Sequence, residues 1–226
     1  MYKITPEMLR EIAGTSTSKK VVDGLVEHLP EVMKKYEIDT KLRIAHFLAQ
    51  LAHESAHFRT LEEYASGQAY EGRADLGNVR RGDGRRYKGR GAIQLTGRYN
   101  YRKMGDILGI DLENNPELAA TPKVSAYVAG EFWTSKNLNE LADADNLKRI
   151  TRKINGGYNG LQDRKEKLLV AKSVMEKAEK IGTQKKVDTV TTPKVVEPSQ
   201  PKINVINVSV PNVKIDLLNN DTKDLS

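Results

Sequence analysis

Residues 53–57 of the chain read His53-Glu54-Ser55-Ala56-His57, a pentapeptide at the end of an apolar segment. Two histidines four residues apart lie on one face of a helix, and a glutamate between them completes the pattern of zinc metalloproteases. The same glutamate can instead protonate the leaving oxygen of a glycosidic bond, with the histidines incidental. The pentapeptide therefore supports two classes of enzyme, a zinc peptidase and a glycosidase.

The zinc interpretation needs a third protein ligand, which usually lies downstream of the two histidines. The chain has four histidines, and the other two, His28 and His46, both precede the pentapeptide. Downstream glutamates are the remaining candidates: Glu62, Glu63 and Glu71. None of them stands at a recognised spacing, so the sequence predicts no metal site and no cofactor.

The glycosidase interpretation needs two carboxyl groups, a proton donor and a base or nucleophile. Glu54 lies in a segment that reads as a largely buried helix, and burial disfavours the ionised form of a carboxyl group. Glu63 follows nine residues later. On one continuous helix these two residues would be about 13.5 Å apart along the axis and on opposite sides. We therefore expect the helix to end near Phe58 and the chain to turn back.

The elements that must position these residues are predicted to be mainly helical. Apolar residues at helical spacing predict helices within residues 5–36, and Asp39-Thr40 is a plausible N-cap for the helix that carries Glu54. Further helices are predicted at 99–109, 123–136, 146–153 and 162–180. Residues 65–91 contain seven glycines and many charges, which indicates a long irregular loop of a kind that is often functional.

Composition limits the class of protein. With 226 residues, 38% of them hydrophobic, the chain predicts one domain with an appendage. The absence of cysteine excludes disulfides and thiolate nucleophiles. The net charge of +7 and pI of about 9.4 suit a polyanion, whether nucleic acid, anionic lipid or bacterial cell wall. The densest basic cluster comprises Arg80, Arg81, Arg85, Arg86, Lys88 and Arg90.

The two ends of the chain carry further expectations. The first residues lack the apolar run of a signal peptide, and no stretch approaches the roughly 20 apolar residues that span a bilayer. Composition changes after Gly182, so we predict a folded domain over 1–182 and a linker over 183–202. Residues 203–226 are predicted to be an extended or β-like tail that is disordered, binds a partner protein or mediates oligomerisation.

Four blocks of the sequence carry a resemblance to a known family. They are 47–55 (FLAQLAHES), 70–73 (YEGR), 88–101 (KGRGAIQLTGRYNY) and 154–157 (INGG). Their order and spacing resemble glycoside hydrolase family 19, and more narrowly its chitinase-like lysozymes of the bacteriophage endolysin type, from about residue 4 to residue 182. The resemblance implies a mainly α, lysozyme-like α+β fold. It also implies a bilobal helical domain, a substrate groove and a long glycine-rich loop.

The resemblance also implies roles for individual residues. Glu54 matches the family's general acid, and Glu63 matches the second carboxylate, which activates water in an inverting reaction. Thr96 matches a Ser/Thr position that helps to hold that water. The matches in the substrate groove are Gln94, Tyr99, Asn100, Asn155 and Arg164. The implied substrate is the glycan strand of peptidoglycan or, alternatively, chitin, and nucleic acid is not expected.

Two departures from the family pattern leave alternatives open. Ala56-His57 stands where the family usually has glycines, and this substitution creates the zinc-like pattern. Glu62 adjoins Glu63, and Glu71 is a further acidic residue, so the second carboxylate is one of these three. We expect the enzyme to be made in a host cytoplasm without a signal peptide. It would then act on the cell wall after release, or as part of a virion.

Overall fold

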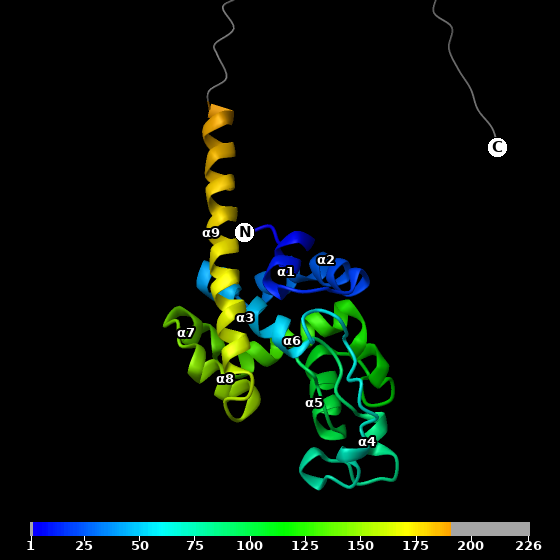
Figure 1. Cartoon of the computed structure of the whole chain (residues 1–226). Helices are drawn as coiled ribbons and strands as arrows, with labels where there is room; N and C mark the ends of the chain where they lie inside the picture. Colours follow the sequence, from blue (N-terminus) through cyan, green and yellow to red (C-terminus); the bar gives the residue numbers. More distant parts are fainter. Residues whose placement is uncertain (1, 191–226) are drawn as a thin grey trace, which may run out of the picture. The chain divides into compact units, whose positions relative to one another are not determined.

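The computed structural model describes residues 2–190, which are mainly helical (Figure 1). Its α-helices are α1 (Pro6–Ala13), α2 (Lys19–Lys35), α3 (Lys41–Glu54), α4 (Asp83–Arg86), α5 (Arg98–Leu108), α6 (Pro122–Ser135), α7 (Leu138–Asp143), α8 (Leu147–Asn155) and α9 (Leu161–Val190). Short 3₁₀ helices lie at η1 (Gln68–Tyr70), η2 (Ala74–Leu76) and η3 (Pro116–Ala120). Within 2–190 the β structure is limited to two isolated bridges, Glu62–Arg90 and Arg90–Leu95. The predicted mainly helical fold is confirmed.

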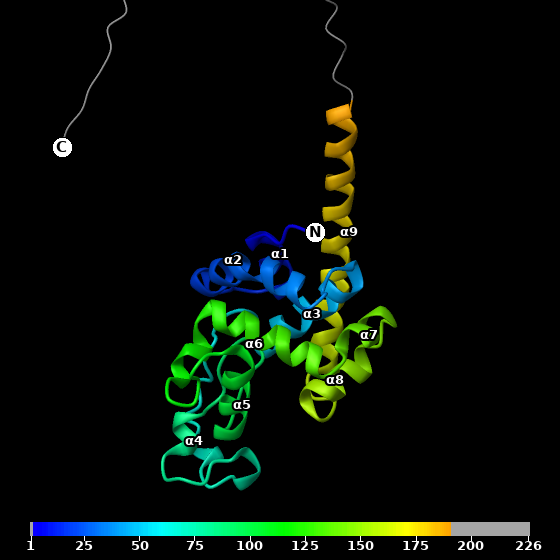
Figure 2. The same ribbon diagram turned by 180° about the vertical axis from the view of Figure 1, so that it is seen from behind.

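Helix α3 is the buried centre of the domain. The Thr40 hydroxyl accepts the backbone N–H of Arg43 at 3.2 Å and caps its first turn. Every residue over 44–52 is buried, as expected for a helix that is apolar around most of its circumference. Helix α9 packs along α3 and lies beside it in both ribbon views (Figures 1 and 2). Together, the two helices place Glu54 at the end of a rigid element.

The described residues have two hydrophobic cores, which agrees with the predicted bilobal domain. The larger core is built from residues of α1, α2, α3, α6, α7, α8 and α9. The smaller core comprises Tyr87, Leu95, Tyr101, Met104, Leu112, Ala119 and Val128. Helix α6 joins the two, since Ala126 and Trp133 belong to the larger core and Val128 to the smaller one. The glycine-rich segment connects α3 to the smaller core.

That glycine-rich segment is irregular, as predicted, apart from η1, η2 and α4. Its own carboxylates hold it in shape. Glu71 accepts the backbone N–H of Gly82 at 2.6 Å and that of Gly84 at 2.8 Å, and Asp83 accepts the N–H of Arg80 at 3.0 Å. A side chain at Gly84 would place its Cβ 2.5 Å from the backbone nitrogen of Glu71, so only glycine fits there. Residues 65–91 are therefore a structured loop.

Helix α9 is longer than predicted. It runs to Val190 instead of ending near residue 180, so the first eight residues of the predicted linker 183–202 are helical. No proline lies between Leu161, where α9 begins, and Pro193, so no missing backbone N–H stops the helix at Gly182. The rest of that linker and the predicted tail over 203–226 lie outside the described residues. Across 2–190, no helix combines the length and the apolar character needed to cross a bilayer.

Candidate active site

The chain turns sharply after Glu54, the last residue of α3. Buried Ser55 accepts the backbone N–H of Phe58 at 3.0 Å through its hydroxyl. Ala56, His57 and Phe58 have φ angles of 50°, 67° and 58°, in the left-handed region. This conformation costs roughly 1–2 kcal/mol for a residue that has a Cβ. The helix ends before Glu63, as predicted, but it ends at Glu54, four residues before the expected end near Phe58.

Arg164 of α9 fixes the carboxylate of Glu54. Its Nη2 donates to Glu54 Oε1 at 2.5 Å, and its Nη1 donates to the amide oxygen of Gln50 on the same helix. The Arg164 side chain has no exposed surface, whereas that of Glu54 is 17% exposed. Arg164 was predicted to bind substrate, but a fully buried guanidinium cannot touch a sugar. In this structure Arg164 binds and orients the carboxylate of Glu54.

The two histidines of the pentapeptide meet at Asp163, the residue before Arg164. Asp163 accepts a hydrogen bond from His53 Nδ1 at 2.6 Å and lies 3.4 Å from His57 Nε2 and 3.2 Å from Lys167 Nζ. Burial opposes the charge of Asp163, but the bonds from His53 and Lys167 hold its pKa below the ordinary value. Burial and the nearby charge of Lys167 lower the pKa of His57.

This arrangement removes the geometric basis of the zinc interpretation. The zinc pattern needs both histidines on one continuous helix, but α3 ends between His53 and His57. Within residues 2–190, no three histidine, aspartate or glutamate side chains gather in a group that could hold a metal ion. The spacing of the pentapeptide therefore has a structural cause, because both rings reach the same aspartate.

Glu63 lies in the irregular loop after α3, where neutral groups hold its carboxylate. Oε1 accepts the hydroxyl of Tyr70 at 3.0 Å, and Oε2 accepts the backbone N–H of Gly89 at 3.0 Å. Lys88 donates to the backbone carbonyl of Glu63 at 3.1 Å. Burial, and then the bond to Glu63, raises the pKa of Tyr70, so its hydroxyl stays a donor. Glu63 is half-buried.

The other two candidates for the second carboxylate are engaged elsewhere. Glu62 accepts Arg90 Nε at 3.1 Å and lies 3.3 Å from Lys88 Nζ. Glu71 clamps the backbone of the glycine-rich loop. Glu62 is exposed and lies against two cations, whereas Glu63 and Glu71 are both half-buried and held by uncharged donors. Glu63 differs from Glu71 in lying beside Gln94, across Gly89. This geometry favours Glu63 over Glu62 and Glu71.

Two predicted groove residues, Gln94 and Asn100, lie near Glu63 together with Thr96, which was predicted to help hold the catalytic water. Thr96 donates its hydroxyl to the carbonyl of Gln94 at 2.9 Å, and Asn100 donates its side-chain amide to the carbonyl of Thr96 at 2.8 Å. Gly89 shows how close this group comes. A Cβ there would lie 2.6 Å from Gln94 Oε1 and 3.1 Å from Glu63 Oε2. The side chains of Gln94 and Glu63 therefore both lie next to Gly89.

Gln94, Thr96 and Asn100 also line a cavity of about 350 Å³, to which α5 and α6 contribute walls. Ile107 and Phe132 contribute apolar surface, and Lys103 adds a charge. Such a mixture suits a sugar ring, which presents apolar faces and a polar edge. Neither Glu54 nor Glu63 belongs to the lining of this cavity. The predicted groove residues therefore form a surface next to the loop carboxylate and not around it.

Two predicted groove residues lie outside that cavity. Tyr99 is 56% exposed, and it packs closely enough on Gly77 that a Cβ there would lie 2.8 Å from the Tyr99 Cβ. Asn155 is the exposed last residue of α8, and Gly156 follows it in the left-handed conformation with φ of 78°. The roles of Tyr99 and Asn155 in substrate binding stay predictions.

Sequence reasoning missed four residues around the two carboxylates. Tyr70 and Gly89 bind Glu63, Gln50 binds Arg164, and Asp163 binds His53. Some signals were present. Gln50 is a polar residue in an apolar stripe one helical turn before Glu54, and Asp163 directly precedes Arg164. Tyr70 and Gly89 stand inside two of the blocks that carry the family resemblance. Their partners could not be read from the sequence, because each contact depends on how the loop folds.

Comparisons with known proteins identify the family of the chain. Residues 32–147 match the family model described as chitinase class I, glycoside hydrolase family 19. A protein of Haemophilus influenzae, named a glycosyl hydrolase family 19 domain-containing protein, is 29% identical over 188 residues, which are 70% of this chain and 92% of that protein. An endochitinase of Arabidopsis thaliana is 40% identical over 119 residues, 52% of this chain. The match spans 40% of that plant protein's length.

Solved structures show the same fold. Chitinase C from Streptomyces griseus has a TM-score of 0.64 and 22% identity, with coverage of 77% of this chain and 93% of that one. A class IV chitinase from Zea mays has a TM-score of 0.59 and 20% identity, covering 78% of this chain and 92% of that one. At these identities the likeness concerns the fold alone.

Proposed function

The chain belongs to glycoside hydrolase family 19 and is a glycoside hydrolase; from that premise we propose that it cleaves the β-1,4 bonds of bacterial peptidoglycan. Glu54 is the general acid and Glu63 the general base of an inverting reaction. Such enzymes separate their two carboxyl groups by roughly 6.5–9.5 Å, which leaves room for a water molecule. Chitin is the second candidate substrate.

The assignment of roles rests on the match of Glu54 and Glu63 to the family's acid and second carboxylate, and the surroundings of the two carboxylates are compatible with it. Arg164 binds Glu54 through Oε1, and among the described residues Oε2 of Glu54 has no hydrogen-bond partner. That oxygen is left to carry a proton to the glycosidic oxygen. Glu63 receives hydrogen bonds from Tyr70 and Gly89, which orient the carboxylate but supply no charge. An oriented carboxylate of this kind suits a base that takes a proton from water.

The reaction follows from these positions. Glu54 gives its proton to the leaving oxygen as the bond to the anomeric carbon breaks. Glu63 takes a proton from water, and the resulting oxygen attacks the anomeric carbon from the opposite face. The Thr96 hydroxyl helps to hold that water. Glu54 ends ionised and Glu63 protonated, and exchange with solvent restores both.

Charge supports peptidoglycan as the substrate. The net charge of +7 favours an anionic wall over chitin, which is a neutral polymer. The resemblance of the four sequence blocks to phage lysozymes supports an endolysin-type role. In that role the enzyme is made in a host cytoplasm and reaches the wall after release, or acts as part of a virion. Chitin remains the second candidate because the plant relative is named an endochitinase.

The test compares purified wild-type protein with Glu54→Gln on peptidoglycan and on chitin. Glu117→Gln is the matched control, because Glu117 is an exposed glutamate on η3. We expect wild type and Glu117→Gln to release sugars from peptidoglycan, and Glu54→Gln to release none. NMR of the first product should show the α-anomer. Cleavage of chitin alone would overturn the substrate, and full activity of Glu54→Gln would overturn the assignment of the acid.

A further inference from the structure

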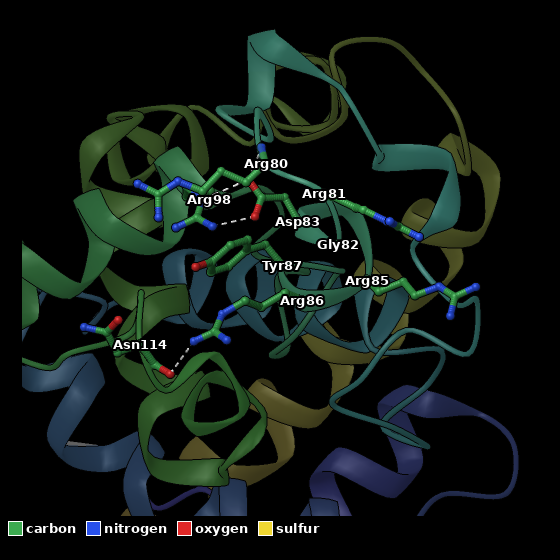
Figure 3. A pocket seen from close by; sticks show the side chains of 9 residues that line it. All are labelled: Arg80, Arg81, Gly82, Asp83, Arg85, Arg86, Tyr87, Arg98 and Asn114. Atoms are coloured by element: carbon green, nitrogen blue, oxygen red, sulfur yellow. Dashed lines mark hydrogen bonds and ion pairs between the residues drawn. The ribbon is translucent and has the colours of Figure 1, made fainter.

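A second concave surface has neither of the two proposed catalytic carboxylates in its lining. It is an open basin of about 690 Å³ formed by α4, the loop before it and the start of α5 (Figure 3). Five of the residues that line it are arginines, and one is an aspartate: Arg80, Arg81, Arg85, Arg86, Arg98 and Asp83. The proposed hydrolysis uses none of these residues.

The carboxylate of Asp83, the aspartate of the basin, is paired with an arginine inside the fold. Asp83 is 2% exposed and accepts Arg98 Nε at 2.9 Å and Arg98 Nη2 at 2.5 Å. Arg98 also donates to Glu113 at 2.9 Å. The hydrogen bonds from Arg98 hold the pKa of Asp83 below its ordinary value. Asp83 is therefore ionised near neutral pH, and its charge is neutralised by Arg98.

The other four arginines have no carboxylate partner within the described part of the chain. Arg80 and Arg81 are exposed, and neither guanidinium makes an ion pair or hydrogen bond to residues 2–190. Arg85 donates to the amide oxygen of Gln68 at 3.2 Å, and Arg86 donates to a backbone carbonyl at 2.8 Å. Both acceptors are uncharged. The basin therefore presents four guanidinium groups that make no direct ion pair or hydrogen bond with a carboxylate among residues 2–190.

Tyr87 forms a buried floor beneath Arg86 and Arg98. The ring of Tyr87 is 1% exposed and lies 5.7 Å from the guanidinium carbon of Arg86 and 4.7 Å from that of Arg98. Its hydroxyl donates to the carbonyl of Glu113 at 2.9 Å. In Figure 3, Arg81 and Arg85 extend to one side while Arg86 turns toward Asn114 on the other. The guanidinium groups do not converge on one point.

We propose that this basin binds successive phosphate groups of a linear phosphodiester polymer of the bacterial cell wall. A guanidinium presents a planar fork of donors that matches phosphate oxygens. Dispersed cations fit a chain with repeated charges better than a single small anion. The choice of a wall polymer rests on the proposed function, whereas the anion site itself does not.

Nucleic acid is the competing polyanion, and the basin lacks what it needs. Proteins that bind single strands stack bases on exposed aromatic rings. The aromatic residue that lines this basin is Tyr87, which is buried. A polymer without bases therefore fits better.

Binding of the whole protein to purified poly(glycerol phosphate) tests this proposal. The variant is Arg80→Gln/Arg81→Gln/Arg85→Gln. The matched control is Lys3→Gln/Lys20→Gln/Lys34→Gln, which removes the same charge from exposed lysines outside the basin. Each phosphate contact contributes about 0.7 to the slope of log affinity against log salt, so the arginine variant should lose roughly two from that slope. From a common affinity near 1 M salt, that change of slope weakens binding on the order of 500-fold at about 50 mM salt.

The control variant should bind like wild type. Equal losses in both variants would overturn the proposal, because binding would then follow net charge alone. Equal or tighter binding of an oligothymidine with the same number of phosphates would also overturn the choice of a wall polymer. Thermal melts of both variants identify any loss that comes from unfolding. The binding assay needs no catalysis, and Glu54→Gln should bind the polymer normally. A failure of the binding proposal can therefore be told apart from a failure of the hydrolase proposal.

Discussion

The two proposed catalytic carboxylates are held in opposite ways. Glu54 ends a buried helix, and a fully buried arginine from 110 residues further along the chain binds it. Glu63 lies in an irregular loop, where a tyrosine hydroxyl seven residues away and a backbone N–H 26 residues away bind it. The first is held by a charge, and the second by neutral dipoles.

The difference shows that one active site draws on two kinds of support. The position of Glu54 depends on how α9 packs on α3, and hence on the larger core. The position of Glu63 depends on the fold of the glycine-rich loop. Substitutions that remove the support of Glu54 should therefore lower the stability of the whole domain. Substitutions that remove the support of Glu63 should change the loop and leave the stability of the domain nearly unchanged.

The largest expected effect is that of Arg164→Met. Removing one partner of a buried ion pair leaves the other charge uncompensated, at a cost of about 3–5 kcal/mol in the free energy of unfolding. Urea denaturation measures this cost. Lys88→Met is the comparison on the other side, since Lys88 lies 3.3 Å from Glu62, whose side chain is 46% exposed. In that pair the Lys88 side chain is 20% exposed and the Glu62 side chain opens to solvent, so its loss should cost about 1 kcal/mol or less.

A double variant sharpens this result. Glu54→Gln/Arg164→Met removes both charges, so it should recover part of the stability that Arg164→Met loses. If Arg164→Met and Lys88→Met cost the same, the proposed contrast between the two supports is wrong.

A smaller effect is expected from Tyr70→Phe. The variant removes one hydrogen bond to the Glu63 carboxylate, worth about 1.5–3 kcal/mol because the acceptor is charged. We therefore expect kcat to fall roughly ten- to hundredfold while the fold stays intact. Tyr64→Phe is the matched control, because Tyr64 is 78% exposed. Steady-state kinetics on soluble glycan fragments measures kcat. An unchanged kcat in Tyr70→Phe would mean that Glu63 does not need this bond.

The smallest effects concern the pH dependence of stability. The pKa of His57 is lowered in the fold, so below about pH 6.5 the unfolded chain binds more protons and stability falls. The pKa of Tyr70 is raised, so its contribution to stability is present below about pH 10 and is lost at higher pH. His57→Gln should flatten the acid limb of the melting temperature, and Tyr70→Phe the alkaline limb. A His57→Gln profile identical to wild type would contradict the first expectation.

The sequence was sufficient for the elements that local patterns specify. Thr40 and the apolar stripe after it predicted α3, and the glycines of 65–91 predicted an irregular segment. The end of α3 was required by the spacing of Glu54 and Glu63. The three left-handed residues that produce the turn carry side chains that disfavour that conformation, so local propensity could not identify them.

Contacts across the fold were beyond the reach of sequence patterns. The burial of Arg164 depends on α9 lying against α3, and its partner Glu54 is 110 residues away. For the same reason, the sequence left the spacing of His53 and His57 without an explanation other than the rejected zinc pattern, whereas both rings reach Asp163. A charged residue in an amphipathic helix normally faces solvent, and here tertiary packing reverses that preference.

The most direct test of the central claim is mass spectrometry of digested peptidoglycan with the neighbouring variants Glu62→Gln and Glu63→Gln. The two residues are adjacent, but Glu62 pairs with Arg90, whereas Tyr70 and Gly89 orient Glu63. We predict new reducing-end sugars from wild type and Glu62→Gln, and none from Glu63→Gln. Loss of product in Glu62→Gln with full activity in Glu63→Gln would contradict the account. Release of free peptides without new reducing ends would contradict it as well.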